Sequence, residues 1–138
     1  MPVVTVGFNY LLDAGFVGGT PITTWYMGLI SNAATITLAS ADTMSSHAGW
    51  TEFTSYTEAT RPQWTVGSAS GGANTNSTVV TFTVSGTGNQ VYGFFVNSVS
   101  TKGGTTGTLW VTGAFSTVRF PTAGQQMKFT YTIRGASS

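Results

Sequence analysis

The sequence TVVTFTV at residues 78–84 alternates apolar and polar side chains with a period of two residues. Successive side chains of a strand point to opposite faces, so the pattern predicts a strand with Val80, Phe82 and Val84 directed inward. The two intervening threonines then face solvent or a partner. This segment favours a β-strand of which one face is buried.

Further segments on both sides of this strand have strand-like patterns. The alternation recurs at 128–133 and, in a shorter form, at 35–38. Continuously apolar runs at 24–30 and 91–96 predict strands covered on both faces, and Gly28 and Gly93 within them indicate bulges or close backbone approach. Three more strands are expected, at residues 109–115, 3–8 and 50–53, the last two as edge strands.

Turn and cap signals complete the predicted fold. Glycine-rich stretches at 85–89 and 101–107 indicate antiparallel hairpins. One short helix is expected at 42–48, with Ser40 or Asp42 as N-cap and Gly49 at its end. We therefore predict an all-β antiparallel β-sandwich with one short helix, jelly-roll-like in preference to immunoglobulin-like, forming a single domain over residues 1–138.

Length and composition exclude several classes of protein. A chain of 138 residues fits one domain, and the absence of cysteine removes disulfides, thiol nucleophiles and cysteine metal sites. No apolar run approaches the ~18 residues of a spanning helix, and no basic segment precedes an apolar stretch near Met1, so neither a membrane span nor a secretory signal is expected. Charged residues make up 7% of the chain, against about 25% in average domains.

The few charges are unevenly distributed along the chain. All four acidic residues precede residue 60, and all five basic residues follow it. The basic residues are dispersed and never cluster, which argues against nucleic-acid binding. The charge asymmetry instead predicts a dipolar molecule whose opposite patches could meet in neighbouring copies.

Candidate catalytic groups are scarce. His47 is the only imidazole, and the segment GSASG at 67–71 has alanine where a nucleophile elbow requires serine. We interpret His47 as interacting with the last carbonyl groups of the short helix. Glu52 and Glu58 are spaced for one face of a continuous strand, as a glycosidase pair requires, but pairing of Glu58 with Arg61 is the preferred interpretation.

Metal and cofactor sites are not expected either. Asp42 and His47 are the only close pair of potential metal ligands, and a spacing of five puts them on different faces of a helix. The glycines at 103–107 lack the Gly-Lys-Ser/Thr end of a phosphate loop. We therefore predict no catalytic, cofactor-binding or metal-binding residues, and a protein that is not an enzyme.

Aromatic side chains occur both in hydrophobic cores and as anchors at binding interfaces. Trp25 and Trp110 lie in predicted strands and are expected in the core. Trp50 and Trp64 flank turn-like stretches, so core and interface positions both stay open for them.

Three segments resemble small virion proteins encoded by tailed bacteriophages: ADTMSSHAGWTE at 41–52, TRPQW at 60–64 and TKGGTTGTL at 101–109. The likeness covers most of residues 22–134. It implies a capsid decoration or cement protein that binds the major capsid protein on the capsid surface of the virion and is made in the bacterial host cytoplasm. Jelly-roll or related β-sandwich folds are common among such proteins.

A protein of this class binds other proteins and does not convert a substrate. We expect a homo-oligomer, trimer preferred and dimer possible, without nucleic acid, membrane or cofactor. The residues expected at protein interfaces are Trp50, Arg61, Trp64, Lys102 and Arg119. The alternative is a carbohydrate- or receptor-binding β-sandwich module of a phage tail, with Trp50, Trp64 or Tyr56 as stacking platforms.

Overall fold

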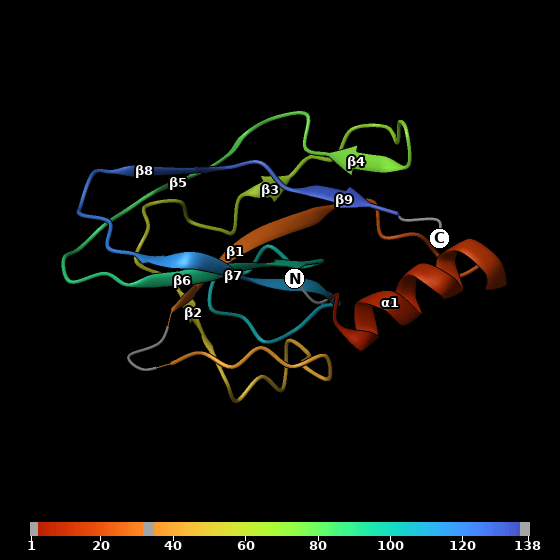
Figure 1. The fold of residues 1–138 in the computed structure, drawn as a ribbon, viewed down its shortest axis with the longest axis horizontal. Coiled ribbons are helices and arrows are strands. Elements are labelled where there is room, and N and C mark those ends of the chain that lie inside the picture. The colour runs from red at the N-terminus through yellow and green to blue at the C-terminus, as the bar shows by residue number, and fades with distance from the viewer. Residues whose placement is uncertain (1–2, 32–34, 136–138) are drawn as a thin grey trace.

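A five-stranded antiparallel sheet forms the centre of the computed structural model, which describes residues 3–31 and 35–135 (Figure 1). The strands follow the order β2-β1-β6-β7, and β3 also pairs with β1. Their bounds are β1 (Trp25–Ser31), β2 (Thr51–Phe53), β3 (Gln63–Trp64), β6 (Val91–Asn97) and β7 (Leu109–Arg119). The predicted strands at 24–30, 91–96, 109–115 and 50–53 are all present, and β2 is an edge strand as expected.

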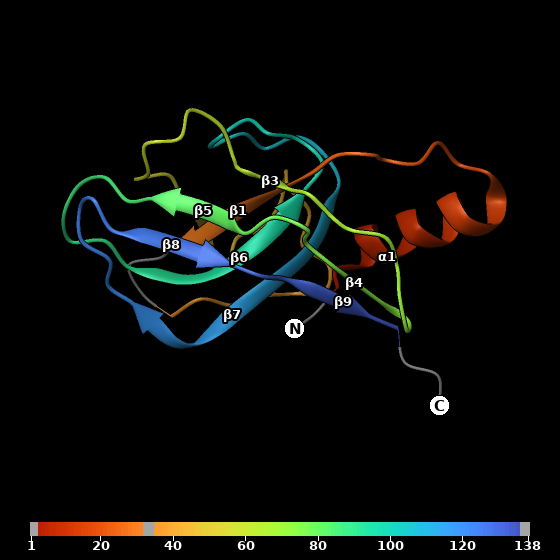
Figure 2. The same ribbon diagram turned by 90° about the horizontal axis from the view of Figure 1, so that it is seen from above.

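Two shorter antiparallel ladders lie over one face of this sheet (Figure 2). One pairs β5 (Val80–Thr83) with β8 (Gln126–Phe129), and the other pairs β4 (Ala73–Thr75) with β9 (Thr132–Arg134). The antiparallel, sandwich-like all-β class predicted from the sequence is therefore confirmed.

The main core fills the space between the central sheet and the two ladders. Val80, Phe82 and Val84 are all buried there, which confirms the inward face predicted from the alternation at 78–84. They pack with Met27 and Val111 of the sheet. Removal of these apolar side chains from water is the main stabilising contribution to such a core.

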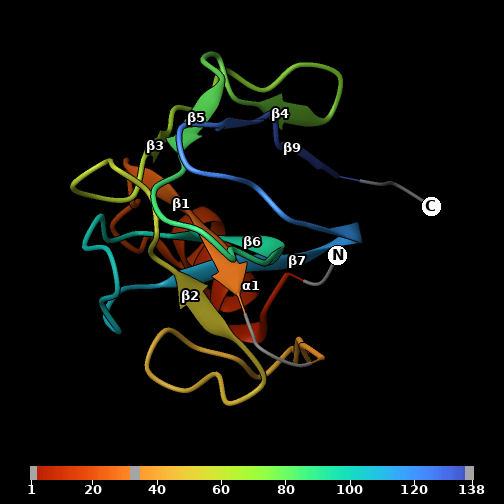
Figure 3. The ribbon, with the colours of Figure 1, turned by 90° about the vertical axis from the view of Figure 1, so that its left-hand side faces the viewer.

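A second, smaller core covers the opposite face of the sheet. Ile30 of β1 and Phe95 of β6 pack there against Met44 and Trp50, which come from the irregular segment at 35–50 (Figure 3). Both faces of the central strands are thus buried, as the continuous apolar runs predict. Gly93 lies beside a register shift between β6 and β7, so the predicted irregularity is present at this position.

The expected edge strand at 3–8 is wrong, because this stretch leads into a helix. Helix α1 (Thr5–Leu12) continues into a π-helical segment, η1 (Asp13–Val17), and ends at Gly18 in the left-handed conformation. Val4 is fully buried, and Gly7 lies directly on the backbone of Trp110. These tertiary contacts override the strand preference of the β-branched residues. Within the described residues, no helix is long and apolar enough to cross a membrane.

The helix expected at 42–48 is absent, and so is the strand at 35–38. Thr43 and Ser46 form an isolated antiparallel bridge around a tight turn. Asp42 accepts hydrogen bonds from the Ala39 amide and from Trp50 Nε1, both at 3.0 Å, so its carboxylate fixes this turn and caps no helix.

The predicted strand at 128–133 is divided into β8 and β9. The Asn76 side chain causes the division, because it takes the place of a neighbouring strand. Asn76 Oδ1 accepts from the Tyr131 amide at 2.8 Å, and Asn76 Nδ2 donates to the Phe129 carbonyl at 3.2 Å. Tyr131 still points inward, as the alternation predicts.

Candidate functional site

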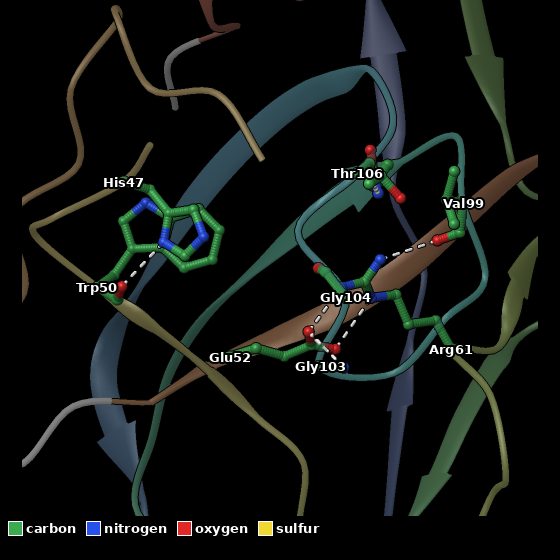
Figure 4. Close-up of polar contacts among 9 residues, drawn as sticks. His47, Trp50, Glu52, Arg61, Val99, Gly103, Gly104 and Thr106 are labelled. Atoms are coloured by element: carbon green, nitrogen blue, oxygen red, sulfur yellow. Dashed lines mark hydrogen bonds and ion pairs between the residues drawn. The ribbon is translucent and has the colours of Figure 1, made fainter. Parts of the chain in front are cut away.

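A buried arginine organises the loops at one end of the central sheet. Arg61 lies in the β2–β3 connection and forms a two-pronged ion pair with Glu52 of β2, with Nε to Oε1 at 2.9 Å and Nη2 to Oε2 at 2.6 Å (Figure 4). Arg61 also donates to the carbonyls of Val99 at 2.9 Å and Gly104 at 2.7 Å. The Gly103 amide donates to Glu52 Oε2. We call these five residues the Arg61 cluster.

The Arg61 cluster corrects one sequence-based pairing. Arg61 pairs with Glu52, and Glu58 instead accepts two contacts from the Thr83 amide, at 2.9 and 3.0 Å. The guanidinium also lies over the Phe95 ring at 5.1 Å from its centroid. Arg61 is 1% exposed, so its charge is held by partners within the chain.

Lys102 is held by the adjoining loop. Its Nζ donates to the carbonyls of Tyr56 at 2.9 Å and Glu58 at 2.7 Å, and lies 4.4 Å from the centroid of the Tyr56 ring. The side chain is half-buried. Lys102 therefore ties the 101–107 hairpin to the segment after β2.

The aromatic ring of Trp50 is enclosed by polar and aromatic neighbours. His47 stacks on the indole at a centroid distance of 3.8 Å, and its Nδ1 lies 3.0 Å from the Trp50 carbonyl oxygen (Figure 4). His47 thus packs on a turn, since the helix whose end it was expected to cap is absent. No group of three metal-ligating residues occurs within 3–31 and 35–135.

The five residues predicted at interfaces lie in different environments. Trp50, Arg61 and Trp64 are buried within the chain and offer no surface to a partner. The Lys102 ammonium is occupied by the Tyr56 and Glu58 carbonyls of the segment after β2. Of the five, Arg119 alone is exposed, at the end of β7, where it lines a groove of about 570 Å³ with Phe120. An interface role for Lys102 and Arg119 stays a prediction.

The three sugar-stacking candidates are enclosed as well. Trp50, Trp64 and Tyr56 all have their rings in the two cores, so none of them presents a face to a sugar. Their prediction as stacking platforms is wrong. The cause is the packing of the segment at 35–50 and of the two ladders, which cover both faces of the sheet.

Exposed apolar residues concentrate on the helical segment instead. Phe16 is 85% exposed and Val17 is 78% exposed, and Phe8, Leu11 and Leu12 also reach the surface. We call residues 5–17 the arm. Sequence reasoning missed this surface because residues 3–8 were assigned to a strand. The glycine pair at 18–19 was a usable signal, because left-handed glycines commonly end helices.

Tyr56 provides a pH-dependent test of the structure. Burial raises the pKa of Tyr56 above its ordinary value, and the nearby Glu52 carboxylate acts in the same direction. Burial also raises the pKa of Tyr131. The folded protein therefore keeps protons that the unfolded chain releases above a pH of about 10, so stability is complete below that pH and decreases above it.

We expect Tyr56→Phe to reduce the loss of stability at alkaline pH. The Tyr56 hydroxyl has no hydrogen-bond partner in the described part of the chain, so the substitution costs little at pH 7. Melting temperatures of the two proteins measured from pH 7 to 11 should diverge above pH 10, with the variant higher. Parallel melting curves across this range would contradict the buried position of the phenol.

Comparison with known proteins gives no family for this chain. No protein-family model matches it, and no curated protein matches it. The three segments that carry the phage resemblance contribute to one structural unit, since Glu52, Arg61 and Gly103 come from one segment each and meet in the Arg61 cluster. The three segments therefore share a structural role in this cluster.

Proposed function

We propose that the protein is a structural virion protein that decorates and cements the capsid shell of a tailed bacteriophage by binding the major capsid protein. The observation that carries the proposal is the distribution of charge. Asp42, Glu52, Glu58, Arg61 and Lys102 are all engaged in contacts within the chain. Among the described residues, eight large apolar side chains are exposed, and most other exposed positions are uncharged serine, threonine or glycine.

Such a surface favours coverage by protein. Burying an unpaired ion is expensive, whereas threonine hydroxyls and apolar side chains are covered at much lower cost. Apolar anchors such as Phe16 and Phe120, which are 85% and 68% exposed, are the type of residue that fills a partner's pocket. A rigid sandwich with two apolar cores supplies the support that a cement protein needs.

The proposal includes self-association and a location. The protein acts as a homo-oligomer, with a trimer preferred over a dimer, on the capsid surface of the virion after synthesis in the host cytoplasm. The sequence resemblance at 41–52, 60–64 and 101–109 supports this assignment. Neither nucleic acid nor membrane is required as a partner.

Co-sedimentation with purified capsids that lack the protein tests the proposal. We expect saturable binding with hundreds of copies per particle at saturation. Phe16→Ser is expected to weaken binding or self-association, and Gly15→Ala, a neighbouring change whose added methyl group meets nothing within 4 Å, serves as the matched control. Failure of the wild-type protein to sediment with capsids would refute the decoration role.

The alternative, a glycan- or receptor-binding module of a phage tail, has one observation in its favour. The groove beside Arg119 combines the exposed Phe120 ring with the polar groups of Gln126 and Lys128. Aromatic rings and hydrogen-bonding side chains together are what sugar recognition requires. Binding on a glycan array that is lost in Phe120→Ser would favour this alternative over capsid decoration.

A further inference from the structure

The arm projects beyond the body of the sandwich (Figure 1). Its tip carries two exposed apolar residues, Phe16 and Val17. The N-terminal part of the arm packs closely on β7. A Cβ added to Gly7 would lie only 2.6 Å from the Trp110 carbonyl oxygen. Phe16 and Val17 lie at the far end, where they contact little of their own chain. Two large apolar side chains in this position favour association with another surface.

A groove of about 670 Å³ lies beside the same arm. Phe8 and Leu11 of α1 form one wall, and the other side comes from the ladder of β4 and β9 and from the segment after β3, through Val66, Ile133 and Arg134. The buried Trp110 also borders it. The groove is therefore mostly apolar, with one cation at its rim.

The tip and the groove carry complementary charges. Asp13 lies in η1 three residues before Phe16 and is exposed, and Arg134 is exposed at the groove. Neither side chain forms an ion pair among the residues that the structure describes. Phe16 and Val17, with the Asp13 carboxylate beside them, thus match an apolar groove that carries the Arg134 guanidinium. The tip does not line the groove of its own chain, so the match has to be made between chains.

We propose that the arm tip of one copy binds in the groove of a second copy, with Phe16 and Val17 against Val66 and Ile133 and with Asp13 near Arg134. Each chain then offers one tip and one groove. A contact between two different surfaces is heterologous, and it closes into a ring when the rotation between neighbours permits it. This inference rests on the self-association in the proposed function, assigns the surfaces that make it, and does not depend on the capsid.

Sedimentation velocity of the purified protein, without capsids, tests this contact. The wild-type chain is expected to form a closed oligomer. Phe16→Asp should weaken association by about 30-fold or more, as removal of a central aromatic anchor does. Val79→Asp is the matched control, because it places the same charge on another exposed apolar residue outside the groove and should leave association unchanged.

Mixing variants distinguishes this geometry from a symmetric contact between two arms. Phe16→Asp keeps an intact groove, and Val66→Asp keeps an intact tip. The mixture should form a heterodimer through the one remaining interface and grow no further. A mixture that stays monomeric would overturn the proposal, and circular dichroism of each variant establishes that both are folded.

Charge reversal gives an independent check. Asp13→Arg and Arg134→Glu should each weaken association, and the double variant should restore it. A double variant as weak as the single ones would count against the charge contact on which the choice of partner depends.

The decoration role and the contact between copies can be refuted independently of each other. Oligomers that do not bind capsids would refute the decoration role and leave this contact standing. A wild-type chain that is monomeric in solution, yet binds capsids in a manner that Phe16→Asp abolishes, would overturn the contact between copies and identify a capsid subunit as the occupant.

Discussion

Replacing Arg61 by alanine is expected to lower the free energy of unfolding by about 3 to 5 kcal/mol, which is the usual cost of breaking a buried ion pair from one side. Glu52 would keep its charge in a buried position with only the Gly103 amide as a partner. The carbonyls of Val99 and Gly104 would lose their donors at the same time. Denaturation with urea, followed by tryptophan fluorescence, measures the effect.

Arg119→Ala is the matched control for this prediction. It removes the same type of side chain from an exposed site, so stability should change by no more than about 0.5 kcal/mol. The double variant Arg61→Met with Glu52→Met should be more stable than Arg61→Ala, since it leaves no unpaired charge. If Arg61→Ala and Arg119→Ala have equal effects, the Arg61 cluster does not hold these loops.

The second large effect is expected for Gly93→Ala, which places a methyl group inside the central sheet. The added Cβ would lie 2.1 Å from the Gly113 carbonyl oxygen of β7, which is backbone and cannot move without breaking the pairing of β6 with β7. We expect a loss of at least about 4 kcal/mol, within the range that marks an exceptional substitution.

Gly15→Ala tests whether the effect comes from packing and not from loss of glycine itself. A Cβ on Gly15 meets nothing within 4 Å, and its φ lies outside the left-handed region. Alanine is favoured over glycine in helices by about 1 kcal/mol, so this variant should be unchanged or slightly more stable. Thermal unfolding of the two variants in parallel provides the comparison, and similar losses in both would contradict the close approach at Gly93.

The strands could be predicted where burial of one or both faces determines the order of apolar and polar residues. Alternation at 78–84 follows from a strand with one buried face, and the apolar run at 91–96 follows from a strand with two. Prediction failed where a single side chain decides the outcome. Asn76 divides the last strand through hydrogen bonds from over 50 residues away, and no local pattern at 128–133 contains that information.

The candidate site shows the same limit. Proximity in sequence favoured Glu58 as the partner of Arg61, but the fold brings Glu52 of β2 to the guanidinium. The arm was missed because Val3 and Val4 are strand formers; in the structure both contact β7, through the Val3–Val111 bridge and the hydrogen bond from the Val4 amide to the Trp110 carbonyl, directly before α1 begins. Long-range packing, which a single sequence does not display, decides both cases.

Electron microscopy of an intact phage particle that contains this protein tests the central claim most directly. The account predicts density for the sandwich in hundreds of copies on the outside of the shell, in contact with major capsid protein, with each projecting helix seated on an adjacent copy. Density confined to a few positions on the tail, with none on the shell, would contradict it.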